Sequence, residues 1–412
     1  MCAKIIPFKA IRPARDKAHL VATRPYYSYT KQILKAKLIH NPYSFIHIIN
    51  PEFRKADKTE PNTIERFEKV RDKFNQFRDE EIFIQDEKPS FYLYRQSAND
   101  QEFVGLIVGA SIDEYNKGEI KIHEETISAR EETFKMYLDV CGFNAEPVLL
   151  AYKENKKIIQ LQKGLMSKRP EYEYTSTDTL KHELWVIDQP DIVQELAHQF
   201  ETVKNLYIAD GHHRCASSAL LGNERLVENN FLNENLSSSY FMAYLIPESS
   251  LKIYDFNRLV SDLNNRSAEE IIGMLEDSFE VSLMKKEFRP TKKHEFAMYL
   301  HSKWYKLNLI QLPTSDNPTD HLDPRILSKL ILHPILGIKD LKTDSRISFL
   351  NGKTGMKGLQ KKVDSGLAKI AFGLYPVSVR DLMHVADTNN IMPPKSTYIE
   401  PKLRSGLTVY EL

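Results

Sequence analysis

A short polar run, Asp210-Gly211-His212-His213-Arg214, directly follows an apolar stretch of strand type at residues 206–209. A helix-compatible segment, residues 214–221, begins at once after it. The pattern predicts a strand, a tight turn at the glycine and a helix N-terminus. The first-turn N–H groups of a helix and the positive end of its dipole favour an anion. Because the histidines and the arginine add further donors, the run predicts a phosphate-binding site.

Asp210 would stand beside that phosphate, and a carboxylate repels a phosphate unless a cation bridges the two or the carboxylate acts as a base. A kinase needs both kinds of group, so we interpret Asp210 as a ligand of Mg²⁺ or as the acceptor of a hydroxyl proton. Two other interpretations stay open. Asp210 could be an ordinary N-cap, with solvated histidines and with Arg214 paired to a surface carboxylate. Alternatively, Asp210, His212 and His213 could hold the metal of a hydrolase.

Composition limits the possible partners. The chain has 412 residues, 42% of them hydrophobic, which is enough for two domains or more. The 57 Lys and Arg residues nearly balance the 56 Asp and Glu residues, so we expect no nucleic-acid partner. Three scattered cysteines fit neither a disulfide framework nor a zinc pattern, and no segment is typical of a signal peptide or a membrane span. We therefore expect a cytoplasmic protein without a membrane partner, and the oligomeric state stays open.

The chain divides by pattern into two blocks. Residues 1–155 are predicted to form an N-terminal α+β region on the substrate side, and residues 156–412 a nucleotide- and phosphate-binding region. Strands are expected at residues 43–49, 90–94, 103–108, 181–187, 239–246, 346–349 and 367–374. Helices are expected at residues 64–77, 190–203, 267–279 and 378–385. Capping pairs are expected at Asn62 and Glu65 for the first, at Ser267 and Glu270 for the third, and at Ser378 and Asp381 for the fourth. Strands and helices that alternate in this way indicate a mixed α+β fold around a sheet.

Three further polar clusters are candidates for function. Arg24-Pro25-Tyr26-Tyr27 lies in a proline-constrained loop. His123 and Glu124 are catalytic candidates, with Glu124 the rival of Asp210 for the role of base, although such a pair is also common as a solvated or capping pair. Near the C-terminus, Pro393 and Pro394 fix an extended backbone that presents its donors with little entropy left to lose. These donors are Lys395, Ser396 and Thr397, and Lys402 and Arg404 add charge. The segment is either a second phosphate anchor or a strand with a solvated basic face.

Four motifs together resemble the family catalogued as domain of unknown function 1015. They are Ala209-Asp210-Gly211-His212-His213-Arg214, Val363-Asp364-Ser365-Gly366, Met392-Pro393-Pro394-Lys395-Ser396-Thr397 and Pro401-Lys402-Leu403-Arg404-Ser405-Gly406. Weaker matches extend the resemblance over nearly the whole chain, at Pro25-Tyr26, Asn41-Pro42, His123-Glu124, His182 with Trp185, and Asp323-Pro324-Arg325. The Gly-His-His-Arg element is similar to the phosphate-binding turn of sulfiredoxins and of ParB-type nucleotide-binding proteins. That fold also includes free-serine kinases, so the resemblance implies a core of this type.

Association of the family with phosphoserine metabolism implies a phosphotransferase that uses ATP or ADP, with Mg²⁺, and a small-molecule acceptor. Free L-serine, giving O-phosphoserine, is the acceptor that the resemblance favours. The predicted nucleotide-binding residues are Gly211, His212, His213, Arg214, Lys395, Ser396, Thr397 and Arg404; the predicted catalytic residues are Asp210, Glu124 and His123, with Asp210 also the metal ligand. The chain departs from the family pattern at Tyr27, where members carry Asp, and at Thr133-Phe134, where members carry Asp-Arg. The alternative is therefore a regulatory protein that binds a nucleotide but does not catalyse the transfer.

Overall fold

The computed structural model describes residues 3–53, 58–98, 101–228 and 237–412, and the chain forms two compact units. Unit 1 comprises Met1–Ile122, Thr126–Leu251 and Pro401–Leu412. Unit 2 comprises His123–Glu125 and Lys252–Glu400. Because the last residues of the chain return to unit 1, Lys402 and Arg404 belong to the same unit as the Asp210–Arg214 run.

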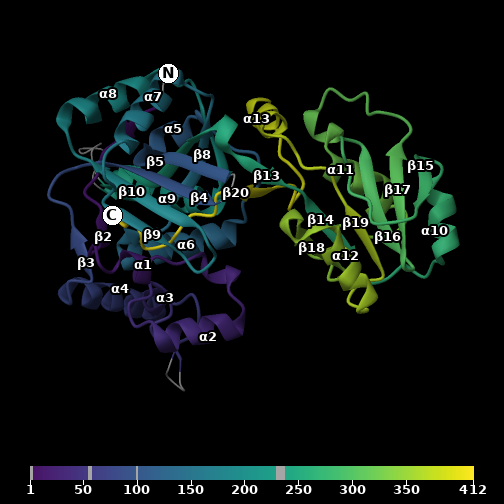
Figure 1. Ribbon diagram of the computed structural model, residues 1–412, viewed down its shortest axis with the longest axis horizontal. Coiled ribbons are helices and arrows are strands. Elements are labelled where there is room, and N and C mark those ends of the chain that lie inside the picture. Colours follow the sequence, from purple (N-terminus) through teal and green to yellow (C-terminus); the bar gives the residue numbers. More distant parts are fainter. Residues whose placement is uncertain (1–2, 54–57, 99–100, 229–236) are drawn as a thin grey trace. The chain divides into compact units, whose positions relative to one another are not determined.

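Unit 1 is built on a mixed nine-stranded sheet (Figure 1). Eight strands lie in the order β6-β11-β8-β12-β5-β4-β10-β9, and β1 pairs with β5. The strands are β1 (Ile5–Ile6), β4 (Phe91–Ala98), β5 (Gln101–Ser111), β6 (Ile120–Lys121), β8 (Val148–Tyr152), β9 (Tyr172–Thr175), β10 (Lys181–Ile187), β11 (Leu206–Asp210) and β12 (Tyr240–Pro247). Among the described strands of this sheet, the β11–β6 and β12–β8 pairs are parallel and the others antiparallel. Strand β11 lies between β6 and β8: β6 pairs with its first two residues, Leu206 and Tyr207, and β8 pairs along it as far as Asp210.

The helices of unit 1 contribute to two hydrophobic cores. They are α1 (Ala18–Val21), α2 (Lys31–His40), α3 (Ile46–Ile49), α4 (Ile64–Asp79), α5 (Ile112–Asn116), α6 (Ser128–Cys141), α7 (Lys156–Met166), α8 (Pro190–Glu201) and α9 (His212–Glu228). Helices α7, α8 and α9 bury apolar side chains in one core with the sheet. Helices α3, α4 and α6 share a second core with two short ladders. These ladders pair β2 (Ile11–Pro13) with β3 (Phe83–Gln85) and β7 (Phe143–Asn144) with β21 (Tyr410–Glu411).

Unit 2 contains an antiparallel six-stranded sheet in the order β15-β17-β16-β19-β14-β18 (Figure 1). Its strands are β14 (Phe256–Val260), β15 (Phe279–Met284), β16 (Glu295–Leu300), β17 (Lys303–Leu309), β18 (Ile347–Asn351) and β19 (Ile370–Gly373). Its helices are α10 (Ala268–Leu275), α11 (Asp323–Leu327), α12 (Gly355–Asp364) and α13 (Val379–Asp387). Helices α10 and α11 contribute to one core against this sheet and α12 to another. A separate ladder pairs β13 (Lys252–Tyr254) with β20 (Tyr398–Glu400).

The mixed α+β class predicted from the sequence is confirmed. The predicted boundary between residues 155 and 156 falls inside unit 1, because the sheet takes β4, β5 and β8 from before it and β10, β11 and β12 from after it. The assignment of the two blocks to substrate and nucleotide stays a prediction. No helix in the described parts of the chain is long and apolar enough to cross a membrane.

Most predicted elements are present, and the errors have local causes. Residues 43–49 are not a strand: Ile46–Ile49 form the short helix α3, whose Ile48 packs with Phe45 in the core around α4. Tertiary packing there overrides the strand preference of the isoleucines. The capping box predicted at Asn62 and Glu65 is not formed: Asn62 has a φ of 62°, and the N-cap is Thr63, which accepts a hydrogen bond from the Arg66 N–H. The helix capped by Ser267 and Glu270 ends at Leu275, and Phe279 begins β15.

Candidate functional site

The turn between β11 and α9 has the predicted strand, glycine and helix, but the helix begins two residues earlier than predicted. Helix α9 starts at His212, directly after Gly211, and has 17 residues. Gly211 has a φ of 103°, and a Cβ atom at this position would lie 3.0 Å from Arg214 Nη2. Glycine adopts this conformation without strain, and a larger residue would also crowd the Arg214 guanidinium. The positive end of the α9 dipole therefore lies beside the carboxyl end of a buried strand.

Asp210 is the last residue of β11, and two cations lie close to its carboxylate. Lys402 Nζ donates to Oδ2 at 3.1 Å, and Arg214 Nη2 lies 3.9 Å from the same oxygen. Burial would raise the pKa of Asp210, but the charges of Lys402 and Arg214 outweigh it and hold the pKa below its ordinary value. The side chain keeps 36% of its surface exposed. Asp210 is thus a charged carboxylate that solvent can still reach.

Arg214 holds a second segment against the turn. Its Nη1 lies 3.0 Å from Glu146 Oε1 and donates to the Pro147 carbonyl at 2.7 Å. These contacts agree with the interpretation in which Arg214 pairs with a carboxylate, although the same guanidinium also approaches Asp210. An arginine has five N–H donors in a fixed fork, so one side chain can bind Glu146 and still face an anion.

Both histidines of the run are neutral, so they can act as donors but add no positive charge. Burial lowers the pKa of His212 to about 4, despite the opposing charge of Asp210. His213 Nε2 accepts a hydrogen bond from the Ile127 N–H at 3.2 Å, so that nitrogen carries no proton and Nδ1 carries it. A neutral imidazole can still donate one hydrogen bond to an anion. The positive charge at this turn therefore comes from Arg214 and Lys402.

Lys402 and Arg404 come from the C-terminal segment, and each has a different partner in unit 1. Lys402, which was not among the predicted nucleotide-binding residues, pairs with Asp210. Arg404 is 5% exposed, and its Nη2 donates to Asp178 Oδ1 at 2.7 Å. The C-terminal segment thus supplies a cation to the β11–α9 turn, as predicted, but the cation is Lys402 and not Arg404.

The remaining predicted residues belong to unit 2. His123 is buried, and its carbonyl accepts a hydrogen bond from the Met392 N–H at 2.9 Å. The His123-Glu124 motif and the segment that begins at Met392 therefore meet within this unit.

Lys395 has a φ of 57° and its Nζ lies 5.6 Å from the centre of the Phe256 ring. Ser396 is buried and its hydroxyl donates to the Pro393 carbonyl at 2.6 Å, so it closes a local turn. Thr397 follows it and directly precedes β20.

The residues at the turn fit one of the two proposed metal roles. Mg²⁺ in phosphate sites is commonly held by one or two carboxylates together with phosphate oxygens, and Asp210 suits that role. Within the described ranges, no cluster of three or more His, Cys, Asp and Glu side chains could hold a metal ion. The hydrolase centre of Asp210, His212 and His213 therefore lacks a sufficient ligand set, and His213 Nε2 is already an acceptor for Ile127.

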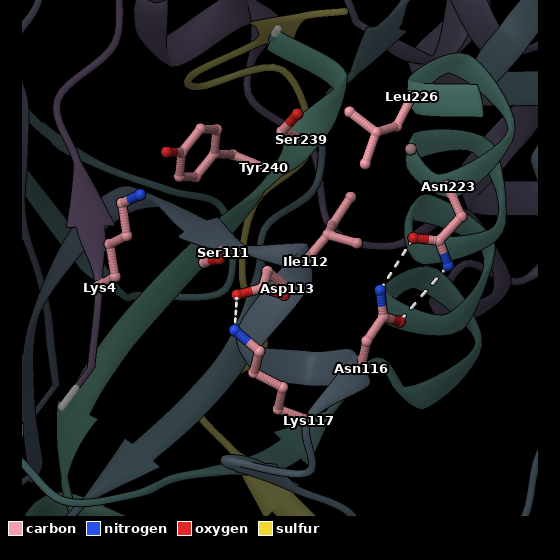
Figure 2. Close-up of a pocket in the computed structure, with 11 residues that line it drawn as sticks. Lys4, Ser111, Ile112, Asp113, Asn116, Lys117, Asn223, Leu226, Ser239 and Tyr240 are labelled. Atoms are coloured by element: carbon pink, nitrogen blue, oxygen red, sulfur yellow. Dashed lines mark hydrogen bonds and ion pairs between the residues drawn. The ribbon is translucent and has the colours of Figure 1, made fainter. Parts of the chain in front are cut away.

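A separate pocket of about 310 Å³ lies between α5, α9 and the start of β12 (Figure 2). Figure 2 shows an amide pair between Asn116 and Asn223 across it and an ion pair between Asp113 and Lys117 at its edge. None of the predicted site residues lines it.

Glu114 lies on α5, the helix that lines this pocket, and it should make the stability of the folded protein depend on pH. It accepts a hydrogen bond from the Lys4 N–H, and burial raises its pKa to about 7. The folded protein therefore binds a proton that the unfolded chain loses near pH 4, so stability from this group falls as pH rises from about 4 to 7. Through this group the wild type should lose up to about 3 kcal/mol of unfolding free energy over this range, and Glu114→Gln should not show this loss. Denaturant unfolding at pH 5 and pH 8 measures it.

The matched control for this measurement is Asp113→Asn on the same helix, where the side chain is exposed. That variant should keep most of the pH dependence of the wild type, because the charge of Asp113 is the smallest of the causes that raise the pKa of Glu114. If Glu114→Gln and the wild type lose equal stability between pH 5 and pH 8, the Glu114 carboxyl does not titrate in this range.

Comparison with known proteins gives one family match. The family described as "Protein of unknown function (DUF1015)" matches residues 5–325, which confirms the family predicted from the motifs. No curated protein matches the chain.

Several solved structures align over most of the chain at low similarity. A mutant of free serine kinase in complex with AMP has a TM-score of 0.37 and 13% identity, covering 74% of this chain and 92% of its own. A conserved hypothetical protein from Pyrococcus furiosus has a TM-score of 0.34 and 14% identity, covering 73% and 91%. C-terminally truncated SbnI from Staphylococcus aureus has a TM-score of 0.38 and 11% identity, covering 73% and 85%. TM-scores this low do not establish what the chain binds.

Proposed function

The chain belongs to the family described as protein of unknown function (DUF1015), and from its own residues we propose that it transfers a phosphoryl group from ATP or ADP to a small hydroxylated metabolite. One observation carries the proposal. A charged carboxylate, Asp210, lies between two cations, Lys402 and Arg214, at the N-terminal end of a 17-residue helix. Phosphoryl transfer needs both cations for the phosphates and a carboxylate for the hydroxyl or for a metal.

In this proposal the nucleotide phosphates bind at the start of α9. The helix dipole and the backbone from Gly211 to Arg214 favour the negative charge, and Arg214 supplies a guanidinium. His212 and His213 act as neutral hydrogen-bond donors. Lys402 approaches the same place from the C-terminal segment and neutralises charge on the transferring group.

Asp210 orients the acceptor hydroxyl and accepts its proton, or it binds Mg²⁺. Mg²⁺, when bound, supplies charge neutralisation for the phosphate oxygens. Because the pKa of Asp210 is lowered, the carboxylate is charged at neutral pH in either role. Glu124 remains the rival base, with His123 beside it, and Lys395, Ser396 and Thr397 remain proposed phosphate ligands.

Free L-serine is the acceptor we propose, from the resemblance of the Gly211–Arg214 turn to that of free-serine kinases. The test is to incubate the full chain with Mg²⁺, L-serine and either ATP or ADP, and to search for O-phosphoserine by mass spectrometry. We expect O-phosphoserine together with an equal amount of the nucleotide that has lost one phosphate. Binding of the nucleotide without this product would contradict the proposed transfer to serine.

The alternative is a nucleotide-binding regulatory protein that does not turn over, and one observation favours it. Helix α6 carries Thr133 and Phe134 where members of the family carry an acid and a base. The Thr133 hydroxyl donates to the Ala129 carbonyl within the helix, and Phe134 is 43% exposed. Neither side chain can exchange a proton with a substrate. Binding of ADP without any phosphorylated product from a panel of small hydroxylated metabolites would support this alternative.

A further inference from the structure

Arg404 is the centre of a second polar cluster in unit 1. Its guanidinium is almost fully buried, and Nη2 donates to both Asp178 oxygens, at 2.7 and 2.9 Å. The same nitrogen lies 3.2 Å from His182 Nε2, whereas Nε has no hydrogen-bond partner among the described residues. Asp178 keeps 28% of its side chain exposed, so the cluster reaches solvent at that side.

Two more cations face the same place. Burial lowers the pKa of Lys37, and the positive charges of Arg24 and Arg404 lower it further, while Asp178 alone opposes them. Arg24 and Lys37 both lie over the Tyr29 ring, at 4.7 and 5.7 Å from its centre. Neither has a carboxylate partner in the described parts of the chain. Three cations therefore lie around one carboxylate, and the excess of positive charge favours the binding of a further anion.

The other groups around Arg404 are neutral and include unused hydrogen-bond donors. Burial and Arg404 lower the pKa of His182 to about 3, so its ring adds no charge. The ring stacks on Tyr174 and Tyr94, with ring centres 4.9 and 6.1 Å away. The Tyr174 hydroxyl and the hydroxyl of the buried Thr23 have no partner among the described residues. A ligand with several acceptor oxygens would satisfy these donors.

The cluster is continuous with the β11–α9 turn. Lys402, which pairs with Asp210, precedes Arg404 by two residues, and two extended residues span about 7 Å. Ser405 then pairs with Thr23 through two backbone hydrogen bonds. The segment that contains these residues therefore contacts both places, with Lys402 paired to Asp210 and Arg404 paired to Asp178.

We propose that Arg24, Lys37 and Arg404 bind the carboxylate of the acceptor, so that the protein selects small hydroxylated carboxylic acids. The inference rests on the proposed function and specifies its substrate class. The acid group of the acceptor binds at the cluster, and its hydroxyl lies toward Asp210. A phosphate of the nucleotide has similar chemistry, so the experiment must distinguish the two anions.

The test is calorimetric titration of the full chain, without nucleotide, with acids and their neutral amides. The probes are L-serine, L-threonine, L-homoserine and D-glycerate, each against its primary amide. We expect at least one acid to bind about tenfold more tightly than its amide, because an ionic hydrogen bond is lost with the carboxylate. Lys37→Ala should abolish that preference and leave ADP affinity unchanged. Lys35→Ala, an exposed lysine of the same helix, should behave as the wild type.

Three results would overturn the proposal. In the first, no acid binds more tightly than its amide. In the second, Lys37→Ala keeps the preference of the wild type. In the third, Lys37→Ala loses ADP affinity, which assigns the cluster to the nucleotide phosphates instead. Binding is measured without turnover, so the two proposals can fail separately. If the protein binds acids more tightly than amides but forms no phosphorylated product, the carboxylate subsite stands and only the proposed transfer is wrong.

Discussion

Asp210→Asn is expected to lower the rate of phosphoryl transfer by about 10²- to 10⁴-fold while nucleotide affinity stays close to that of the wild type. Asparagine has the shape of aspartate but cannot carry the charge that Lys402 and Arg214 hold on Asp210. It can neither accept the hydroxyl proton nor bind a divalent cation as strongly. The two cations would remain at the turn and would still attract the phosphates. Steady-state kinetics of product formation, with ADP binding by calorimetry, measure both effects.

A matched control is available on the surface of unit 1. Asp139 pairs with Arg225 at 2.9 Å, as Asp210 pairs with its cations, but it lies on an exposed part of α6. Asp139→Asn should leave the rate and the affinity unchanged. Glu124→Gln tests the rival base: if it removes the activity and Asp210→Asn does not, the base is Glu124 and the role assigned to Asp210 is wrong.

The local part of the candidate site could be predicted from the sequence because it depends on neighbouring residues. A buried strand, a glycine and a helix in immediate succession can form only a tight turn, and Gly211 has the positive φ that such a turn requires. The capping boxes at Ser267 and Ser378 were predicted for the same reason, since each motif lies within four residues. The helix start was misplaced because His212 and His213 are weak helix formers that packing nevertheless holds in α9.

The long-range part could not be predicted in this way. Nothing in the spacing of residues indicates that Lys402 reaches Asp210 while Arg404, two positions later, pairs with Asp178. That division depends on where the final segment crosses the sheet of unit 1. The charge state of His212 could not be predicted either, because it depends on burial, which lowers the pKa of His212 and is a property of the fold.

Arg214→Ala is the second variant with a large expected effect, a loss of ADP affinity of about 10- to 100-fold. The guanidinium is the one cation on the first turn of α9, and alanine removes it without disturbing the helix. Arg225→Ala, on the same helix and paired with Asp139, is the control and should bind ADP as the wild type does. Arg214→Lys should recover part of the affinity, because it keeps the charge but loses the fork of donors.

The structural role of Arg214 makes this test more demanding. Arg214 also holds Glu146 and the Pro147 carbonyl, so its removal could weaken binding by releasing that segment from the turn. Glu146→Gln separates the two causes, since it breaks the same ion pair and leaves the guanidinium in place. If Glu146→Gln binds ADP normally and Arg214→Ala does not, the guanidinium acts on the nucleotide itself. Undiminished ADP affinity in Arg214→Ala would instead limit this arginine to positioning Glu146 and Pro147, and Lys402 would then be the cation that binds the phosphates.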